Sequence, residues 1–200
     1  MKRIAMAEVR STFSLRPGDS APAFRLPAPD GAMHDLQEIR GTEGLLVIFA
    51  CNHCPFVIHL AAEVASLARE IGASGVKTVA ISSNDISRYP QDAPEHMSSF
   101  ATEYGWDFPY LFDETQAVAK AYSAACTPDF FLFDSELRLY YSGQFDDSRP
   151  KSGTPVTGAD LRAAVKSMLA GEPAPERPYP SSGCSIKWKI GSEPSWFAPR

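Results

Sequence analysis

Two cysteines, Cys51 and Cys54, are separated by two residues and lie between an apolar run and an amphipathic pattern. The run 45–50 contains only apolar side chains, which is typical of a strand covered on both faces. After the cysteines, apolar residues recur at spacings of three and four, which predicts a helix that ends near Gly72. The segment 76–82 predicts a second buried strand. Strand, cysteine loop, helix and strand form one unit, which places the chain in the α/β class.

The segments after this unit extend the same architecture. Residues 94–104 and 158–170 predict two further helices. Residues 129–133 and 139–143 are joined by a connection too short for a parallel crossover, so we expect an antiparallel hairpin. The polar, proline-bearing segment 84–94 predicts a loop. The expected fold is a central mixed β-sheet flanked by helices.

The domain organisation follows from where these patterns begin and end. We expect a lead-in at 1–16, one domain at 17–171 and an extended, Pro-rich C-terminal tail at 172–200. A single domain of this length buries a substantial core. The tail shows neither the helical nor the strand period, so no regular element is expected in it.

Composition argues against several classes of partner. The net charge is −5 and no Lys/Arg cluster occurs, so we expect neither nucleic acid nor an anionic membrane surface as a partner. No run of about 18 apolar residues occurs, so no membrane-spanning helix is expected. The basic start at 1–3 is followed too soon by Glu8 and Arg10 to make a signal peptide. We therefore expect a cytoplasmic protein.

Four cysteines are too few and too unevenly spaced for a disulfide scaffold, and a reducing compartment does not maintain one. The close pair is instead expected to be reactive. Cys51 is predicted to be an exposed nucleophile, because a helix N-terminus stabilises its thiolate. Cys54 lies one helical turn further and is predicted to resolve the mixed disulfide. A protonated His53 is expected to favour the thiolate and to make the disulfide more oxidising.

A metal site is the alternative for the same residues. Cys51, His53 and Cys54 are all zinc-type ligands, and Cys126 or Cys184 would complete a set of four. The sequence has no second Cys-x-x-Cys and no His-x-x-x-His, so the redox interpretation is preferred. We expect neither a metal ion nor another cofactor.

Thr127 and Pro128, just before the apolar segment 129–133, are a second landmark. Other motifs that keep their order along the chain are Pro17-Gly18-Asp19-Ser20-Ala21-Pro22-Ala23-Phe24, Asp113, Phe131-Leu132-Phe133-Asp134 and Tyr141-Ser142-Gly143. Together, over 17–170, they resemble the thioredoxin-like superfamily, particularly its redoxin and peroxiredoxin-like branch, which is related to alkyl hydroperoxide reductase and thiol-specific antioxidant proteins. The resemblance implies that Pro128 is cis and packs beside the cysteines, and that Thr127 contacts the substrate chain. Asn52 and Pro128 are also predicted to bind the substrate.

The sequence departs from the peroxiredoxin pattern around the cysteines. A peroxiredoxin carries a threonine or serine three residues before its peroxidatic cysteine and a proline four residues before that. Matching Cys54 to this site puts Cys51 and Val47 at those two positions. Matching Cys51 puts Ile48 and Gly44 there. Neither register supplies the groups that activate a peroxide, so the sequence favours thiol-disulfide exchange.

We therefore predict a thiol-disulfide oxidoreductase that acts on a disulfide-bearing or oxidised protein substrate and is served by a thiol reductant. A peroxiredoxin-like thiol peroxidase, with an antioxidant role, is the enzymatic alternative. A metal-binding or protein-binding module on the same fold is the second alternative.

The two remaining cysteines are candidates for additional redox residues. Cys126 lies two residues before Pro128 and is expected near the pair, either to capture a disulfide or as a small buried apolar side chain. Cys184 lies in the tail and is followed by Ile186 and Trp188, which suggests that the tail docks. Cys184 is either a third redox partner, a bridge to a second copy in a homodimer, or an incidental thiol.

Overall fold

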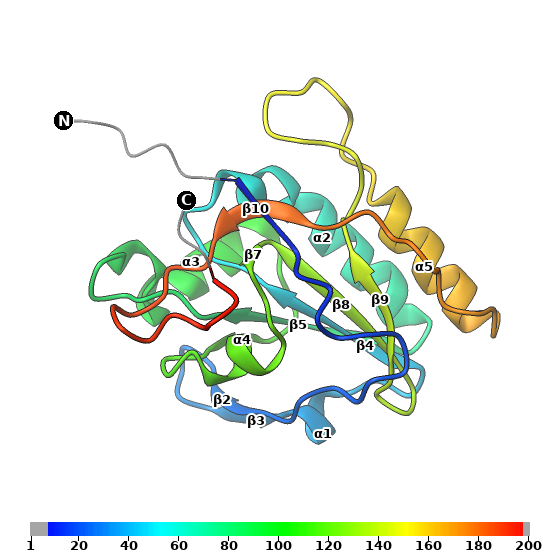
Figure 1. The fold of residues 1–200 in the computed structure, drawn as a ribbon, viewed down its shortest axis with the longest axis horizontal. Coiled ribbons are helices and arrows are strands. Elements are labelled where there is room, and N and C mark those ends of the chain that lie inside the picture. The colour runs from blue at the N-terminus through cyan, green and yellow to red at the C-terminus, as the bar shows by residue number, and fades with distance from the viewer. Residues whose placement is uncertain (1–7, 198–200) are drawn as a thin grey trace.

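The computed structural model describes residues 8–197. The described chain combines strands and helices in the order shown in Figure 1. These elements are β1 (Glu8–Arg10), β2 (Arg25–Pro27), β3 (Met33–Asp35), α1 (Leu36–Ile39), β4 (Gly44–Phe49), α2 (Pro55–Ala73), β5 (Val76–Ser82), the 3-10 helix η1 (Pro90–Asp92), α3 (Pro94–Tyr104), β6 (Tyr110–Phe112), α4 (Ala117–Ala121), β7 (Cys126–Thr127), β8 (Asp129–Asp134), β9 (Leu139–Gly143), α5 (Ala159–Leu169) and β10 (Ser182–Ser185).

The central sheet has five strands in the order β6-β5-β4-β8-β9. Strands β4, β5 and β6 run parallel, whereas β8 pairs antiparallel with both β4 and β9. Every residue of β4 is buried, as expected for a strand with covered faces. The predicted strand-helix-strand unit and the predicted hairpin are both present, and the mixed α/β fold is confirmed.

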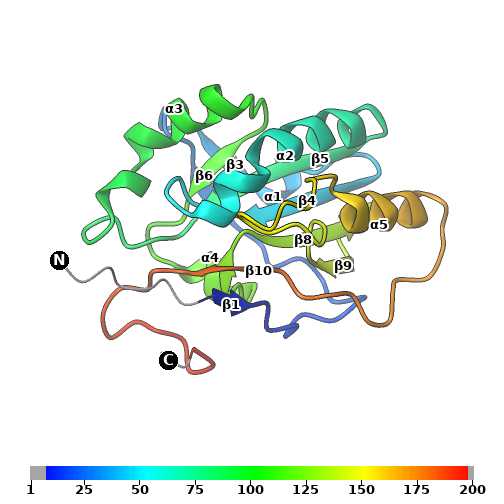
Figure 2. The same cartoon turned by 90° about the horizontal axis from the view of Figure 1, so that it is seen from above.

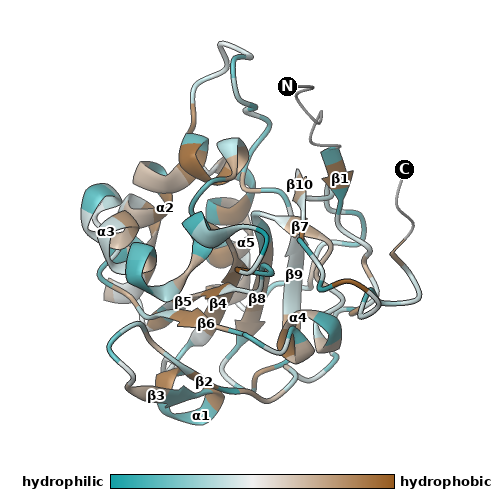
Figure 3. Cartoon of the chain, turned by 90° about the vertical axis from the view of Figure 1, so that its left-hand side faces the viewer, coloured by the Kyte–Doolittle hydropathy of each residue, from teal (hydrophilic) through white to brown (hydrophobic). Residues whose placement is uncertain are grey.

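Helices cover both faces of this sheet, and each face has its own apolar core (Figure 2). Helices α2, α3 and α5 pack on one face, where β4 contributes Leu46 and Ile48. Helices α1 and α4 and the hairpin β2-β3 cover the other face, where Leu45, Val47 and Phe49 point. The alternation follows from the two-residue period of a strand. Figure 3 shows hydrophobic colouring concentrated in the central strands and mixed colouring in the helices.

Local sequence explains where α2 and α3 begin. Pro55 and Pro94 occupy the first turn of α2 and α3, where a missing N–H costs nothing. Gly105 ends α3 with a left-handed backbone, φ 70°, that glycine adopts without strain. The helix predicted to end near Gly72 ends at Ala73.

The C-terminal region contains an element that the sequence pattern did not indicate. Strand β10 lies in the predicted extended tail and pairs antiparallel with β7 and with β1. Its partners are distant in sequence, and four residues are too few to show a period, so the expectation of a tail without elements is wrong at 182–185. Ile186 and Trp188 are buried in the core beneath α4 and β2-β3. The tail therefore docks on the fold.

The predicted lead-in at 1–16 includes β1, which pairs with β10, while its first seven residues lie outside the described part of the chain. The boundaries of the three predicted segments stay a prediction. No helix between residues 8 and 197 is long and apolar enough to cross a membrane.

Candidate active site

The cysteine pair lies where β4 ends and α2 begins. Cys51 follows β4 after Ala50, and Cys54 is the N-cap residue of α2. Both are free thiols that are almost completely buried, at 1% and 0% exposure. The predicted position between strand and helix is therefore correct, whereas the expected exposure of Cys51 is not. The turn over the cysteines and the strand β10 beside them leave no open path to either sulfur in this conformation.

The environment of Cys51 disfavours its thiolate. Burial, the hydrogen bond to Cys54 and the negative charge of Asp92 raise the pKa of Cys51 well above its ordinary value. The hydroxyl oxygen of Thr127, 3.4 Å from Cys51 Sγ, acts in the opposite direction but is outweighed. The proton of Cys51 is therefore held more tightly than that of an ordinary cysteine.

The environment of Cys54 has the opposite balance. Burial again raises the pKa, but hydrogen bonds from Cys184, Cys51 and Thr127 and from the backbone N–H of Val57 outweigh it and lower the pKa far below the ordinary value. The helix begins after Cys54, so the unpaired N–H groups of its first turn face that sulfur. When protonated, Cys54 instead donates to the carbonyl oxygen of Thr127 at 3.0 Å. The helix thus stabilises a thiolate on Cys54, and not on Cys51 as the sequence suggested.

A buried carboxylate organises the turn between the cysteines. Asp92 Oδ1 accepts the backbone N–H groups of Asn52 and His53 at 2.9 and 3.2 Å. Asp92 Oδ2 accepts from Asn84 Nδ2 at 2.8 Å and lies 2.7 Å from His53 Nδ1. The same His53 nitrogen lies 3.9 Å from Cys51 Sγ. Asp92 therefore fixes both the backbone of the turn and the orientation of the imidazole.

This arrangement changes the role expected of His53. The same ring nitrogen, Nδ1, faces both Asp92 and Cys51. A proton relay through an imidazole uses one ring nitrogen for each partner, so His53 is not placed to relay a proton between these two groups. The ring stacks on Tyr89 with centroids 5.6 Å apart, and His53 Nε2 is buried without a partner among the described residues. The negative charge of Asp92 opposes the thiolate that a protonated His53 was expected to favour.

Asn52 was expected to contact the substrate, but its polar groups are used within the protein. Its side-chain Nδ2 donates to the carbonyl oxygen of Gln91 at 3.0 Å. Its Oδ1 accepts from the hydroxyl of Tyr110 at 3.0 Å. Asn52 therefore ties the cysteine turn to η1 and to β6.

Thr127 and Pro128 lie beside the cysteines, as the resemblance implied, and the peptide bond between them is cis. Thr127 was also expected to receive a substrate chain through its backbone. In the structure the backbone of Thr127 pairs with Cys184 of β10. The C-terminal tail of the same chain therefore occupies the position expected for a substrate chain.

The two additional cysteines have different surroundings. Cys184 is buried in the same core cluster as Cys51 and Cys54, and it lies opposite Thr127, whose carbonyl oxygen contacts Cys54. Cys126 Sγ lies 3.5 Å from the carbonyl oxygen of Pro128, and burial raises its pKa well above the ordinary value. Of the two candidates, Cys184 is the one that shares the buried cluster of the pair in the described part of the chain.

A cation could be held by a different set of ligands from the one proposed for zinc. One ligand atom each of Cys51, His53 and Asp92 lie within 4.8 Å of one another. The predicted set named Cys54 together with Cys126 or Cys184 instead. The hydrogen bond between His53 and Asp92 accounts for the proximity of these two groups without a metal ion.

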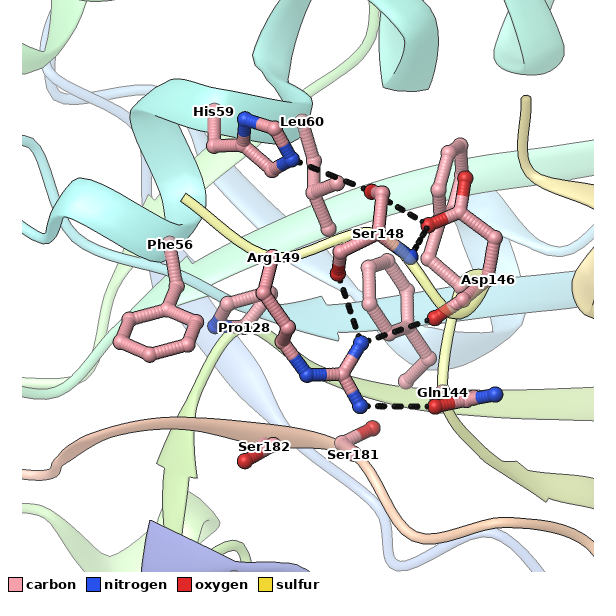
Figure 4. A pocket seen from close by; sticks show the side chains of 12 residues that line it. Phe56, His59, Leu60, Pro128, Gln144, Asp146, Ser148, Arg149, Ser181 and Ser182 are labelled. Carbon is pink, nitrogen blue, oxygen red and sulfur yellow. Dashed lines mark hydrogen bonds between the residues drawn. The ribbon is translucent and has the colours of Figure 1, made fainter. Parts of the chain in front are cut away.

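A pocket lies next to Pro128 on the side facing α2 (Figure 4). His59 Nε2 is 3.1 Å from the hydroxyl oxygen of Ser148 across it. The guanidinium of Arg149 donates to Gln144 Oε1 at 2.8 Å. No cysteine lines this pocket, so it does not give access to the buried sulfurs. The remaining lining residues are Phe56, Leu60, Phe130, Phe145, Asp146, Ser181 and Ser182.

Asp92, Asn84 and Tyr89 were missed by the sequence analysis, which assigned 84–94 only as a loop. One signal for them was present. Strands β4 and β5 are parallel, so the loop after β5 leaves the same sheet edge as the cysteine turn after β4. Polar residues in that loop are therefore placed to reach the cysteines.

The mixed sheet, the cis-proline and the Cys-x-x-Cys at the start of α2 define a thioredoxin-like redox protein. The model of the redoxin family matches residues 16–160. The chain therefore belongs to the redoxin family.

Individual relatives agree with this assignment. An uncharacterized conserved protein from Geobacillus kaustophilus has a TM-score of 0.90 and 49% identity, over 94% of this chain and 100% of that chain. The thioredoxin domain of a thiol-disulfide oxidoreductase from Bacteroides vulgatus shares the fold, with a TM-score of 0.58 and 17% identity over 76% and 99% of the two chains. "Putative peroxiredoxin MT2597" of Mycobacterium tuberculosis is 30% identical over 113 residues, 56% of this chain and 67% of that protein.

Proposed function

We propose that the protein is a thiol-disulfide oxidoreductase whose working couple is Cys51 and Cys54. The observation that carries the proposal is that both thiols lie in one buried cluster at the entrance of α2, where each sulfur contacts Thr127. The start of α2 favours a thiolate on Cys54, and the spacing of the two cysteines allows a disulfide between them. The proposed substrate is a disulfide-bearing or oxidised protein, and a thiol compound or protein regenerates the reduced pair.

The exchange proceeds in two steps. Cys51 transfers its proton to Cys54, and the Cys51 thiolate attacks one sulfur of the substrate disulfide. The substrate bond breaks and its other sulfur leaves as a thiolate, which takes the proton from Cys54. Cys54 then attacks Cys51, forms the Cys51–Cys54 disulfide and releases the second substrate sulfur as a thiolate. Two electrons pass from the pair to the substrate.

Access to the pair requires a movement, because both sulfurs are buried. His53 Nδ1 lies 3.9 Å from Cys51 Sγ, and the His53 side chain is partly exposed, at 16%. We expect an outward turn of this side chain to open Cys51 rather than Cys54, because it is Cys51 that His53 contacts. This difference supports Cys51 as the attacking sulfur, although the thiolate of the resting pair lies on Cys54.

The test is a redox titration in glutathione buffers combined with trapping. Wild-type protein is expected to titrate as one two-electron couple, which Cys54→Ser and the double variant Cys51→Ser/Cys184→Ser both lose and the control Cys126→Ser keeps. With a disulfide substrate, Cys54→Ser is expected to accumulate a mixed disulfide on Cys51. Failure of the wild-type pair to oxidise contradicts the proposal. A mixed disulfide found only in Cys51→Ser assigns the attack to Cys54.

A thiol peroxidase is the second candidate, favoured by the name of the Mycobacterium tuberculosis relative. The thiolate on Cys54 at the start of α2 is the group that would attack a peroxide. Hydrogen peroxide consumption by wild-type protein with a thiol reductant measures this activity. Saturable turnover that Cys54→Ser abolishes and Cys126→Ser retains would replace the exchange proposal with a peroxidase.

A further inference from the structure

Strand β10, which lies beside β1 in Figure 2, carries a third cysteine, Cys184. It is the middle strand of the small sheet β1-β10-β7. Its Cys184 pairs in register with Thr127, whose carbonyl oxygen lies 3.0 Å from Cys54 Sγ. Opposed residues of antiparallel strands lie about 5 Å apart, so Cys184 is a close neighbour of the pair.

The approach of β10 is built into its sequence. A Cβ atom at Gly183 would lie 2.1 Å from the carbonyl oxygen of Thr127, so only glycine fits there. Before this point, the hydroxyl of Ser181 donates to the carbonyl oxygen of Gly143 at 2.7 Å. After it, Ile186 is buried in the second core. The strand is therefore anchored on both sides of Cys184.

Three of the four sulfurs form one cluster. Cys51, Cys54 and Cys184 are each at most 2% exposed and belong to the same buried core. Cys54 Sγ lies 3.0 Å from the carbonyl oxygen of Thr127, the residue that Cys184 opposes, and the pKa of Cys54 responds to both Cys51 and Cys184. Cys54 is therefore the central sulfur, with one possible disulfide partner on each side. Cys126 is adjacent to Thr127 along β7, so its side chain points to the other face of that strand, toward the carbonyl oxygen of Pro128.

We propose that Cys184 is a third redox cysteine, which exchanges with the Cys51–Cys54 disulfide to give Cys54–Cys184. The Cys184 thiolate attacks Cys54 Sγ, so that the Cys54–Cys184 bond forms and the Cys51–Cys54 bond breaks. Cys51 leaves with the bonding electron pair and takes up the proton that Cys184 lost. The step rearranges an already oxidised protein and needs no further oxidant. It rests on the proposed function, which supplies the first disulfide.

The rearrangement has two consequences. Cys51 becomes a free thiol beside His53, while the protein stays oxidised by two electrons in the Cys54–Cys184 disulfide. The bond also fixes β10 against α2, so the backbone of Thr127 stays closed to another chain. A peptide cannot add as a strand to β7 while β10 is paired there.

The first test uses Cys51→Ser, in which only the second disulfide can form within the cluster. The variant is oxidised with diamide, quenched in acid, alkylated, digested and analysed by mass spectrometry. We expect the peptides containing Cys54 and Cys184 to be linked in most molecules. The matched control Cys51→Ser/Cys126→Ser is expected to give the same link, and Cys51→Ser/Cys184→Ser to lose it at least tenfold. Free Cys184 in the folded Cys51→Ser variant, or a link from Cys54 to Cys126, overturns the proposal.

The second test follows the rearrangement in protein with all four cysteines. After diamide oxidation and acid quenching, N-ethylmaleimide is expected to label Cys51 in wild-type protein. Cys184→Ser is expected to lower that labelling at least tenfold, because Cys51 then stays in its disulfide. Equal labelling in both proteins overturns the proposal. If the Cys51–Cys54 bond forms in neither, the proposed function fails, whereas the Cys51→Ser result still decides the role of Cys184.

Discussion

Asp92 connects parts of the chain that are far apart in sequence, and it does so with a buried charge. Its carboxylate accepts from Asn52, His53 and Asn84, which compensates for the loss of water. The same charge raises the pKa of Cys51. Asp92 therefore holds the turn in place and also makes the reduced pair harder to ionise.

Replacing Asp92 by asparagine is expected to make the disulfide more oxidising. Asp92→Asn keeps an acceptor for the backbone of the turn and removes the charge that opposes the Cys51 thiolate. A change of about one pKa unit corresponds to about 1.4 kcal/mol and to about 30 mV for a two-electron couple. Redox titration should therefore show a less negative potential for the variant. The buried control Asp113→Asn, whose carboxylate accepts from Ser83 and the N–H of Ala119, should leave the potential unchanged.

Asp129 is a second buried carboxyl group, at the start of β8. Burial raises its pKa from 3.8 to about 6, although Ser11 Oγ donates to it at 2.7 Å and the N–H of Ala125 at 3.2 Å. The folded state therefore holds this proton more tightly than the unfolded state. The stabilisation is complete below pH 3.8 and is lost as the pH rises through about 6.

The pH dependence of stability should show this difference. Between the two pKa values, wild-type protein is expected to lose up to about 3 kcal/mol in free energy of unfolding relative to Asp129→Asn, which does not titrate. Denaturant unfolding at pH 4, 5, 6 and 7 measures the difference. A constant offset between the two proteins over this range would show that Asp129 titrates equally in the folded and unfolded states.

At the scale of elements, β10 depends on one glycine for its position. Gly183→Ala places a Cβ atom against the carbonyl oxygen of Thr127 and is expected to cost about 2 kcal/mol of stability and to loosen β10. Thiol labelling with Ellman's reagent should become at least tenfold faster. Gly72→Ala is the matched control, because it lies in α2 with no neighbour within 4 Å and alanine favours a helix. Equal labelling rates in both variants would argue against a covering role for β10.

The elements predicted well from sequence are those whose signal is local. The continuous apolar run 45–50 and the helical spacing of apolar residues after Cys54 are each visible within one short segment. Both elements form where expected. Strand β10 and the contact of Asp92 with His53 depend on residues far apart in the chain, and no short window contains that information. The helix was expected after the cysteines, as found, but the sequence alone did not show that Cys54, and not Cys51, is the N-cap residue that the first N–H groups face.

At the scale of the whole molecule, the tail contributes to both cores. A chain ending at residue 172 loses Ile186 and Trp188, and burial of each is worth about 2 kcal/mol. We expect the free energy of unfolding to fall by about 4 kcal/mol and the cysteines to be labelled faster. Thermal melting and thiol labelling measure both effects. Ile190→Ala, a tail residue that is 79% exposed, should change neither. Unchanged melting of the shortened chain would show that the tail contributes no stability.

The pairing of β1 with β10, next to the cysteines, joins segments near the two ends of the described chain. The ribosome synthesises Cys51 and Cys54 well before Cys184. The pair therefore leaves the ribosome before β10, the strand that covers it, has been synthesised. During translation the two thiols are therefore open to oxidants and to foreign sulfhydryls, and the protein gains its shielded cluster only when the last strand leaves the exit tunnel.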